Sequence, residues 1–277
     1  MRAYSFINTL LTIGLASGAA LEKRATKWQP SAAANEKWQI ILSSTLSMGA
    51  PLSPNAATVW DLDLFETDAS TIASLKARGK TVMCYFSSGT SEANRPDLNR
   101  LSSYDYGAGL PDWPGERWLD LRSERVWSVM LGRIQLAAQK GCDAIDPDNI
   151  DGYSNESGGG FSPPLSTSDS IRFLNRMASA ADSLGMSIGL KNAMDILDSV
   201  ADNIQFAVNE ECIAIGECDV YNKFIGSGKP VYHIEYGSAY EASRFCSNGY
   251  LNTVVKRLSL DGWVHYCDGS EYTSTTG

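Results

Sequence analysis

The sequence has few histidines and none of the cysteine spacings that hold metal ions. Its only histidines are His233 and His265, and no Cys-x-x-Cys motif or Cys/His cluster occurs. A zinc site needs three or four such ligands close together, so zinc is not expected, and no other motif implies a metal or a cofactor. No Gly-x-Gly-x-x-Gly follows the first expected strand, which argues against a dinucleotide-binding fold.

Positive charge and long apolar runs are also scarce. Lys and Arg number 23 against 32 Asp and Glu, for a formal net charge of −9. Nucleic acids and anionic membranes bind clustered Lys and Arg, so neither is an expected partner, whereas a cationic partner or substrate is compatible with this charge. No segment approaches the ~20 apolar residues of a membrane span.

The N-terminal residues are typical of a secretion signal. Arg2 precedes an apolar stretch from Phe6 to Leu15, and the small residues Ser17 to Ala20 follow, as a signal peptidase requires. Leu21-Glu22-Lys23-Arg24 is typical of a dibasic processing site. We therefore expect a signal peptide at 1–20, a processing segment at 21–24 and one secreted domain at 25–277. A membrane anchor and a plain polar linker are the respective alternatives.

Six cysteines in a secreted chain predict disulfides. Cys212 and Cys218 are close enough to close a small loop, and Cys246 and Cys267 flank what we expect to be the last helical stretch. For Cys84 and Cys142, each at an expected strand, a bridge and two buried thiols remain equally open. The triplet Asn155-Glu156-Ser157 is an N-glycosylation acceptor and predicts a surface loop.

Short apolar segments alternate with helical ones along the whole mature chain, without a second domain. The expected strands are Trp38–Leu42, Val59–Phe65, Thr81–Ser87, Trp118–Leu121, Cys142–Asp148, Ser187–Asn192, Phe206–Glu210 and Pro230–Tyr236. The expected helices include Ala69–Arg78, Glu124–Gln139, Ser168–Leu184 and Tyr221–Gly226. Several helices end at a glycine just before a strand, namely Gly79, Gly141, Gly185 and Gly228. This alternation predicts an α/β fold, a single-domain (β/α)8 TIM-type barrel.

The ends of the expected strands carry unusually many polar residues. In such a barrel these ends meet at one mouth, where catalytic groups lie. A single carboxylate there is most simply a helix N-cap, but carboxylates at most strand ends are harder to explain in that way. The candidate substrate-binding residues are Asp61, Asp63, Tyr85, Asp120, Asp146, Asn149, Asp151, Tyr153, Lys191, Asn192, Asn209, Glu235 and Tyr236.

The segment from Cys142 to Tyr153 is the densest in carboxylates. Asp146 and Asp148 point to the same side of a strand, because side chains alternate. A calcium loop beginning at Asp146 would have Ile150 at its fifth position and Asp151 in place of the glycine at its sixth, so that spacing fails. We therefore expect these carboxylates at the barrel mouth rather than around a metal ion.

Two carboxyl groups without a metal are typical of glycoside hydrolysis, in which one protonates the leaving oxygen and the other attacks the sugar or activates water. Asp148 is one candidate, and Glu210, at the end of a later strand, is the second; Glu211 remains open as its alternative. Aromatic residues near strand ends, among them Trp113, are candidate sugar platforms, although each alone is more simply a packing residue. Lys191 is placed to lower the pKa of a neighbouring carboxyl.

Six motifs in this order resemble glycoside hydrolase family 114. They are Trp-Asp61-Leu-Asp63-Leu-Phe65, Val-Met-Cys-Tyr85-Phe86-Ser-Ser-Gly89, Trp113-Pro114-Gly-Glu-Arg-Trp118-Leu-Asp120, Gly-Cys-Asp143-Ala-Ile-Asp146-Pro-Asp148-Asn-Ile-Asp151-Gly-Tyr153, Gly-Leu-Lys191-Asn192 and Phe-Ala-Val-Asn209-Glu210-Glu-Cys212. The resemblance covers nearly the whole mature chain. Members commonly have Glu-Pro-Asp-Asn where this chain has Asp146-Pro-Asp148-Asn149.

The resemblance implies a secreted endo-α-1,4-polygalactosaminidase that cleaves galactosamine-containing polymers such as galactosaminogalactan. It places the catalytic pair on Asp148, as nucleophile or base, and Glu210, as acid. The expected partner is a cationic polysaccharide, bound by a monomer. The alternatives are a non-catalytic binder of such a polymer and a barrel hydrolase of another α-glycan.

Overall fold

The computed structural model describes residues 27–34, 36–246, 249 and 251–277. The predicted signal peptide and processing segment lie outside the described residues. Among the residues described, no helix is long and apolar enough to cross a membrane.

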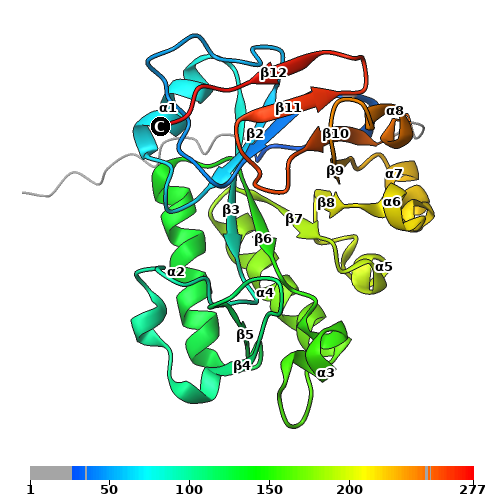
Figure 1. Ribbon diagram of the computed structural model, residues 1–277. Helices are drawn as coiled ribbons and strands as arrows, with labels where there is room; N and C mark the ends of the chain where they lie inside the picture. Colours follow the sequence, from blue (N-terminus) through cyan, green and yellow to red (C-terminus); the bar gives the residue numbers. More distant parts are fainter. Residues whose placement is uncertain (1–26, 35, 247–248, 250) are drawn as a thin grey trace, which may run out of the picture.

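Ten strands form one mixed sheet that curls into a half-barrel, with helices around it (Figure 1). The first eight strands in spatial order are parallel, and the last two, β11 and β12, are antiparallel. In order they are β1 (Trp38–Ile41), β2 (Val59–Asp63), β3 (Thr81–Ser87), β6 (Ala144–Asp148), β7 (Ser187–Lys191), β8 (Phe206–Glu210), β9 (Val231–Tyr236), β10 (Asn252–Lys256), β11 (Trp263–Tyr266) and β12 (Glu271–Thr273). The predicted barrel architecture is confirmed.

The prediction of a barrel strand at Trp118–Leu121 was wrong. The segment Trp118–Leu121 overlaps β5 (Arg117–Leu119), which pairs antiparallel with β4 (Tyr106–Gly109) in a separate two-stranded sheet. The eighth parallel strand is instead β10, which follows Cys246. An apolar run of three or four residues is typical of either kind of strand, and only its pairing partner distinguishes them.

The helices lie outside the sheet (Figure 1). They are α1 (Ala69–Ala77), α2 (Glu124–Lys140), α3 (Glu156–Gly159), α4 (Thr167–Ser183), α5 (Leu197–Val200), α6 (Cys212–Ile215), α7 (Asn222–Gly226) and α8 (Ala242–Phe245). No helix is described between β1 and β2. The four glycines predicted to end helices all have positive φ, from 74° to 90°, a backbone region that favours glycine.

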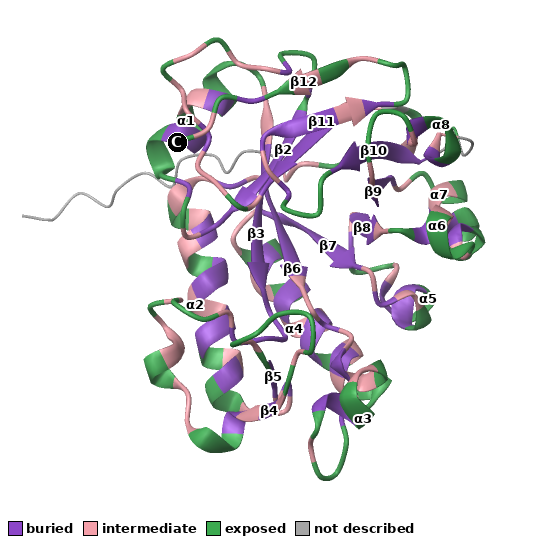
Figure 2. Cartoon of the chain, viewed as in Figure 1, coloured by how far each residue is buried: buried purple, intermediate pink, exposed green. Residues whose placement is uncertain are grey.

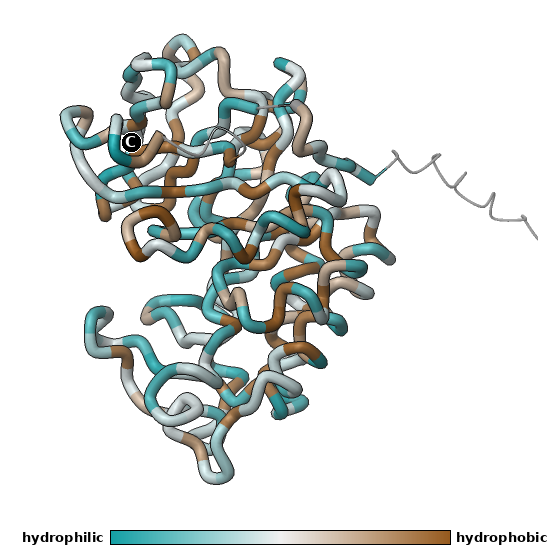
Figure 3. The backbone as a smooth tube through the Cα atoms, turned by 90° about the vertical axis from the view of Figure 1, so that its right-hand side faces the viewer, coloured by the Kyte–Doolittle hydropathy of each residue, from teal (hydrophilic) through white to brown (hydrophobic). Residues whose placement is uncertain are grey.

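Two hydrophobic layers follow from the alternation of side chains along the strands. Figure 2 shows the parallel strands buried and the outer helix faces exposed, and Figure 3 shows the hydrophobic segments concentrated in the middle of the molecule. One layer lies between sheet and helices and includes Leu62, Ile145 and Leu174. The other fills the barrel and includes Ile40 and Met83. Residues at the next inward positions, toward the carboxyl ends of the strands, therefore face the barrel mouth.

All six cysteines form disulfides, so the question left open for Cys84 and Cys142 is settled as a bridge. The other bridges are Cys212–Cys218 and Cys246–Cys267, as predicted. The expectation of a helix between Cys246 and Cys267 was wrong, because that segment holds β10 and β11, and α8 ends just before Cys246.

Candidate active site

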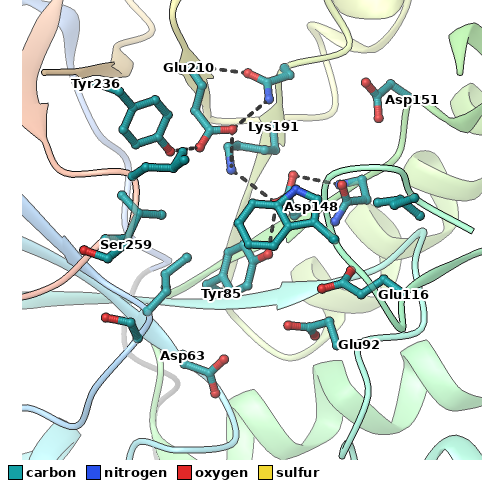
Figure 4. Close-up of a pocket in the computed structure, with 18 of the residues that line it drawn as sticks. Asp63, Tyr85, Glu92, Glu116, Asp148, Asp151, Lys191, Glu210, Tyr236 and Ser259 are labelled. Carbon is teal, nitrogen blue, oxygen red and sulfur yellow. Dashed lines mark hydrogen bonds and ion pairs between the residues drawn. The ribbon is translucent and has the colours of Figure 1, made fainter.

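A pocket of about 460 Å³ lies at the carboxyl ends of the parallel strands (Figure 4). Six neighbouring strands each contribute one polar side chain to its lining: Asp63 from β2, Tyr85 from β3, Asp148 from β6, Lys191 from β7, Glu210 from β8 and Tyr236 from β9. The mouth of a parallel barrel is where these ends converge, so local strand register alone brings the six together.

Asp148 is held by three donors. The Tyr85 hydroxyl donates to its Oδ2 at 3.0 Å, and the Lys191 Nζ lies 3.3 Å from the same oxygen. Its Oδ1 accepts from the backbone N–H of Asn149 at 2.7 Å. These donors fix the orientation of the carboxylate, a requirement for a nucleophile or base.

Glu210 has a matching set of donors. Its Oε2 lies 3.3 Å from Lys191 Nζ and accepts from Asn192 Nδ2 at 3.1 Å, and the Tyr236 hydroxyl donates to Oε1. Burial by itself raises the pKa of Glu210, but Lys191, Tyr236 and Asn192 together hold that pKa below its ordinary value.

Lys191 joins the two carboxyl groups. It is buried, and its single ammonium lies equally far from Asp148 and Glu210. Burial lowers the pKa of a lysine, but the charges of Asp148 and Glu210 outweigh that effect and raise the pKa of Lys191 well above its ordinary value. The lysine therefore stays charged and holds the two carboxyl groups at one point.

The chain turns sharply just after three of these strands. Asn149, Asn192 and Glu211, which follow β6, β7 and β8, have positive φ of 60°, 47° and 64°. Such backbone costs free energy for residues other than glycine and clusters at functional sites. The turn leaves the Glu211 side chain exposed and outside the pocket lining, whereas Glu210 lines the pocket.

Four further carboxylates line the pocket. Arg95 pairs with Asp63 at 2.5 Å and with Glu92 at 2.7 Å. Glu116 accepts a hydrogen bond from the Thr90 hydroxyl at 2.9 Å, and Asp151 accepts one from Asn155 Nδ2. Neither carboxylate has an ion pair among the described residues. Burial raises the pKa of both Glu116 and Asp151.

The lining thus has six carboxylates, namely Asp63, Glu92, Glu116, Asp148, Asp151 and Glu210, against two cations, Arg95 and Lys191. Among the described residues, one group of three potential metal ligands lies close enough to bind an ion: Cys212, Cys218 and His233. Its two sulfurs form a disulfide, which removes the thiolates that a metal needs.

A sequence profile of glycoside-hydrolase family GH114 matches residues 18–272. The chain belongs to family GH114. It is therefore a glycoside hydrolase, and the pocket at its barrel mouth is the candidate active site of a GH114 enzyme.

Solved structures agree with this assignment. The crystal structure of Aspergillus fumigatus Ega3 in complex with galactosamine is 43% identical, with a TM-score of 0.81 over 88% of this chain and 98% of Ega3. The glycoside hydrolase domain of PelA from Pseudomonas aeruginosa has the same fold at 14% identity, with a TM-score of 0.62 over 81% of this chain and 95% of that domain. Comparison with curated proteins returns no match.

Most of the predicted site residues meet at the GH114 pocket. Asp63, Tyr85, Asp148, Asn149, Asp151, Lys191, Asn192, Glu210 and Tyr236 all line it. Asp61 and Asp146 lie fully buried in the barrel, outside the lining. Asn209 is also buried and donates to Asn192, so it supports the lining from outside.

Three other predicted residues, in addition to Asp61, Asp146 and Asn209, lie outside the pocket lining. Asp120 pairs with Arg122, and Tyr153 is half-buried in a short 3-10 helix after β6. Glu235 is fully buried, and its Oε1 forms a hydrogen bond of 2.9 Å with His233 Nε2. The same oxygen accepts a hydrogen bond from the backbone N–H of Ile213. Because Glu235 and Tyr236 are neighbours on β9, their side chains point to opposite faces of the sheet. Tyr236 lines the pocket, so Glu235 points away from the barrel mouth.

The candidate site also includes residues that the strand-end argument missed. Glu92, Arg95 and Leu110 come from the long segment between β3 and β5, and Leu258 to Leu260 come from the turn after β10. Trp113, a predicted sugar platform, and Glu116 line the pocket from the same hairpin region. The motif Trp113-Pro-Gly-Glu116 was the one available signal for them, because it contributes to the family resemblance.

Proposed function

We propose that this chain is a secreted endo-acting enzyme that hydrolyses α-1,4-linked galactosamine polymers, with Asp148 as nucleophile or base and Glu210 as acid. The observation that carries the proposal is the meeting of these two carboxyl groups on one buried ammonium within the pocket. Secretion is supported by three disulfides, which persist in oxidising compartments.

The two carboxyl groups supply the chemistry that cleavage requires. Glu210 gives its proton to the glycosidic oxygen as the bond to the anomeric carbon breaks, while Asp148 attacks that carbon or, as a base, takes a proton from the water that attacks it. Where Asp148 attacks, the ionised Glu210 then takes a proton from the water that releases the sugar from Asp148. Neither step needs a metal ion. Only protonated Glu210 can act as the acid, and because its pKa lies below the ordinary value we expect cleavage to be favoured at acidic pH.

The charge of the pocket supports a cationic substrate. Four of its six lining carboxylates share two cations, whereas Glu116 and Asp151 have no cation partner among the residues that the structure describes. An amino sugar brings the missing positive charge, which an uncharged glycan does not. Ega3, at 43% identity, was crystallised with galactosamine, a sugar of this kind.

The test is incubation of the purified protein with partly deacetylated α-1,4-galactosaminogalactan, with products followed by mass spectrometry. We expect a ladder of short galactosamine oligomers, and we expect Asp148→Asn and Glu210→Gln to lower turnover by roughly 10²–10⁴-fold. Asp120→Asn is the matched control, because it makes the same chemical change at a carboxylate outside the pocket lining.

Other outcomes separate the alternatives. Retention on the polymer without cleavage by the folded wild type would make the protein a binder of cationic polysaccharide. Cleavage of an α-glycan that lacks amino groups, with none of the galactosamine polymer, would assign another substrate. Near-normal turnover in either carboxylate variant would remove the role given to that residue.

A further inference from the structure

Two carboxyl side chains lie inside the barrel directly beneath the catalytic candidates. Asp61 on β2 and Asp146 on β6 have no exposed surface, and none of their four carboxylate oxygens has a hydrogen-bond donor among the described residues. Buried polar groups almost always have a partner, because an unpartnered one costs free energy. A buried carboxylate costs still more, so this arrangement needs an explanation.

Side-chain alternation directs both residues into the barrel, because they share the parity of the inward-facing Val59 and Ala144. β3 lies between β2 and β6, with Asp61 opposite Met83 and Asp146 opposite Tyr85. The two carboxyl groups are within hydrogen-bond reach of each other. Two ionised carboxylates at this separation repel each other, but one proton turns the repulsion into an O–H···O⁻ hydrogen bond.

Within the part of the chain that the structure describes, no nearby cation is free to neutralise the pair. The charged and titratable groups that face it are Lys191 from β7, Asp148 from β6 and Glu210 from β8. Lys191 directs its ammonium to Asp148 and Glu210. The remaining titratable groups at the mouth have partners of their own: Asp63 pairs with Arg95, Tyr85 donates to Asp148 and Tyr236 donates to Glu210.

We propose that Asp61 and Asp146 share a proton in the folded enzyme, and that the charge of this pair sets, through Lys191, the ionisation of Asp148 and Glu210. The two residues do not line the pocket, so they act as positioning residues rather than catalytic ones. The proton bonds to one carboxyl oxygen and is accepted by the other group, with no further reactant.

The pKa directions agree with the geometry. Burial, and then the charge of Asp146, raise the pKa of Asp61 well above its ordinary value. Burial likewise raises the pKa of Asp146 to about 7, although Lys191 opposes the shift. The pair therefore retains one proton above neutral pH and takes up a second as the pH falls through neutrality.

An infrared measurement tests the shared proton independently of activity. Exposed carboxyls are ionised at about pH 8, so we expect the wild type to retain one carboxylic-acid C=O band there. Asp61→Asn and Asp146→Asn should each abolish that band, and the matched Asp148→Asn and Glu210→Gln variants should retain it. Absence of the band from folded wild type at this pH would overturn the proposal.

The kinetic test rests on the proposed function and uses the pH profile of kcat/KM. Each single Asn variant removes one negative charge and supplies a permanent amide donor, so the pKa of the remaining carboxyl falls and this group keeps its charge to lower pH than the wild-type pair does. Below neutrality the variant therefore has the greater negative charge, which raises the pKa of Asp148 and Glu210, and we expect both limbs of the profile to move to higher pH. The double Asn variant, uncharged like the acidic wild-type pair, should restore the wild-type limbs.

The direction of the limb shift separates the explanations. A shift to lower pH in the single variants would mean that both carboxyls are ionised in the wild type. A fall in kcat without any shift would mean that the pair does not take up its second proton below neutrality, or that its charge does not act on Asp148 and Glu210. Both results overturn the proposal. If no variant or wild-type protein cleaves the polymer, the proposed function fails while the infrared result still decides the shared proton.

Discussion

At the scale of single residues, the two catalytic candidates differ in sequence but have matching surroundings. Each has a tyrosine hydroxyl as donor, Tyr85 for Asp148 and Tyr236 for Glu210, and both contact Lys191. Similar surroundings do not by themselves divide the roles of acid and nucleophile. Two measurements on the reaction do so.

Tyr236→Phe tests which carboxyl carries the proton. The Tyr236 hydroxyl helps to hold the pKa of Glu210 below its ordinary value, so its removal raises that pKa. If Glu210 is the acid, activity requires its protonated form, and the alkaline limb of the kcat/KM profile moves to higher pH. Movement of the acidic limb to higher pH would instead show that Glu210 works ionised, and the two roles would be exchanged.

The separation of the two carboxyls predicts the stereochemical outcome. Asp148 Oδ2 and Glu210 Oε2 each lie 3.3 Å from Lys191 Nζ. The distance between these two oxygens is therefore less than the sum of the two contacts. Retaining pairs are about 5–5.5 Å apart, whereas inverting pairs need roughly 6.5–9.5 Å to admit a water. We therefore expect the first product from the α-linked polymer to be the α anomer, observed by NMR before mutarotation. An initial β anomer would show inversion.

At the scale of elements, the β4–β5 hairpin brings the second half of the pocket to the barrel mouth. The loop between its strands carries Trp113, whose side chain is 54% exposed, and Glu116, which lines the pocket opposite Tyr236 and Ser259 (Figure 4). The hairpin is held to the segment after β3 by the bridge between Thr90 and Trp118. This insertion, rather than a barrel strand, supplies Glu116, a carboxylate with no ion pair among the residues described.

Glu116→Gln tests whether that carboxylate recognises an amino group. We expect KM for the deacetylated polymer to rise about five-fold, equivalent to roughly 1 kcal/mol, with little change in kcat. Glu92→Gln removes the same charge from the same pocket, but Glu92 is already paired with Arg95, so its effect on KM should be smaller. Equal effects of the two variants would point to long-range charge instead of a contact.

At the scale of the whole molecule, side chains close the half-barrel between its first and eighth parallel strands. The Trp38 indole N–H donates to the Asn252 carbonyl at 2.7 Å, and the Lys256 Nζ donates to Gln39 Oε1 at 2.8 Å. Lys256 is fully buried, and burial lowers its pKa to about 7. The closure therefore includes a lysine that the fold disfavours in its charged form.

Lys256 makes stability depend on pH. Its folded pKa is below the unfolded value, so the unfolded chain binds more protons above about pH 7, and this group makes stability rise with pH from there to about pH 10. Lys256→Met changes the free energy of unfolding by an amount that depends on pH. We expect this change to be more stabilising, or less destabilising, at pH 6 than at pH 9, with a difference of roughly 2–3 kcal/mol between the two pH values. Chemical denaturation at both pH values measures this difference.

The exposed Lys223, in a surface pair with Asp198, provides the control. Lys223→Met should change stability equally at the two pH values. An equal change in Lys256→Met would mean that its lysine is charged in the folded protein.

The sequence alone determined the features that depend on local periodicity. Side chains alternate along a strand and parallel strands end at one edge, so the positions of Asp148, Lys191 and Glu210 already predicted a shared mouth. The alternation of segments also predicted the barrel and the helix-ending glycines, and the count and spacing of the cysteines predicted two of the disulfides. The motif resemblance added the family, which no periodicity could name.

Only the tertiary structure decided which distant groups pair. Arg95 pairs with both Asp63 and Glu92, Glu116 has no ion pair among the described residues, and Asp61 lies beside Asp146. Pairing between distant segments also decided that β10, and not the predicted strand Trp118–Leu121, is part of the barrel sheet. The physical reason is that pairing and burial depend on separations in space between segments far apart in the chain, and spacing along the chain does not contain those separations.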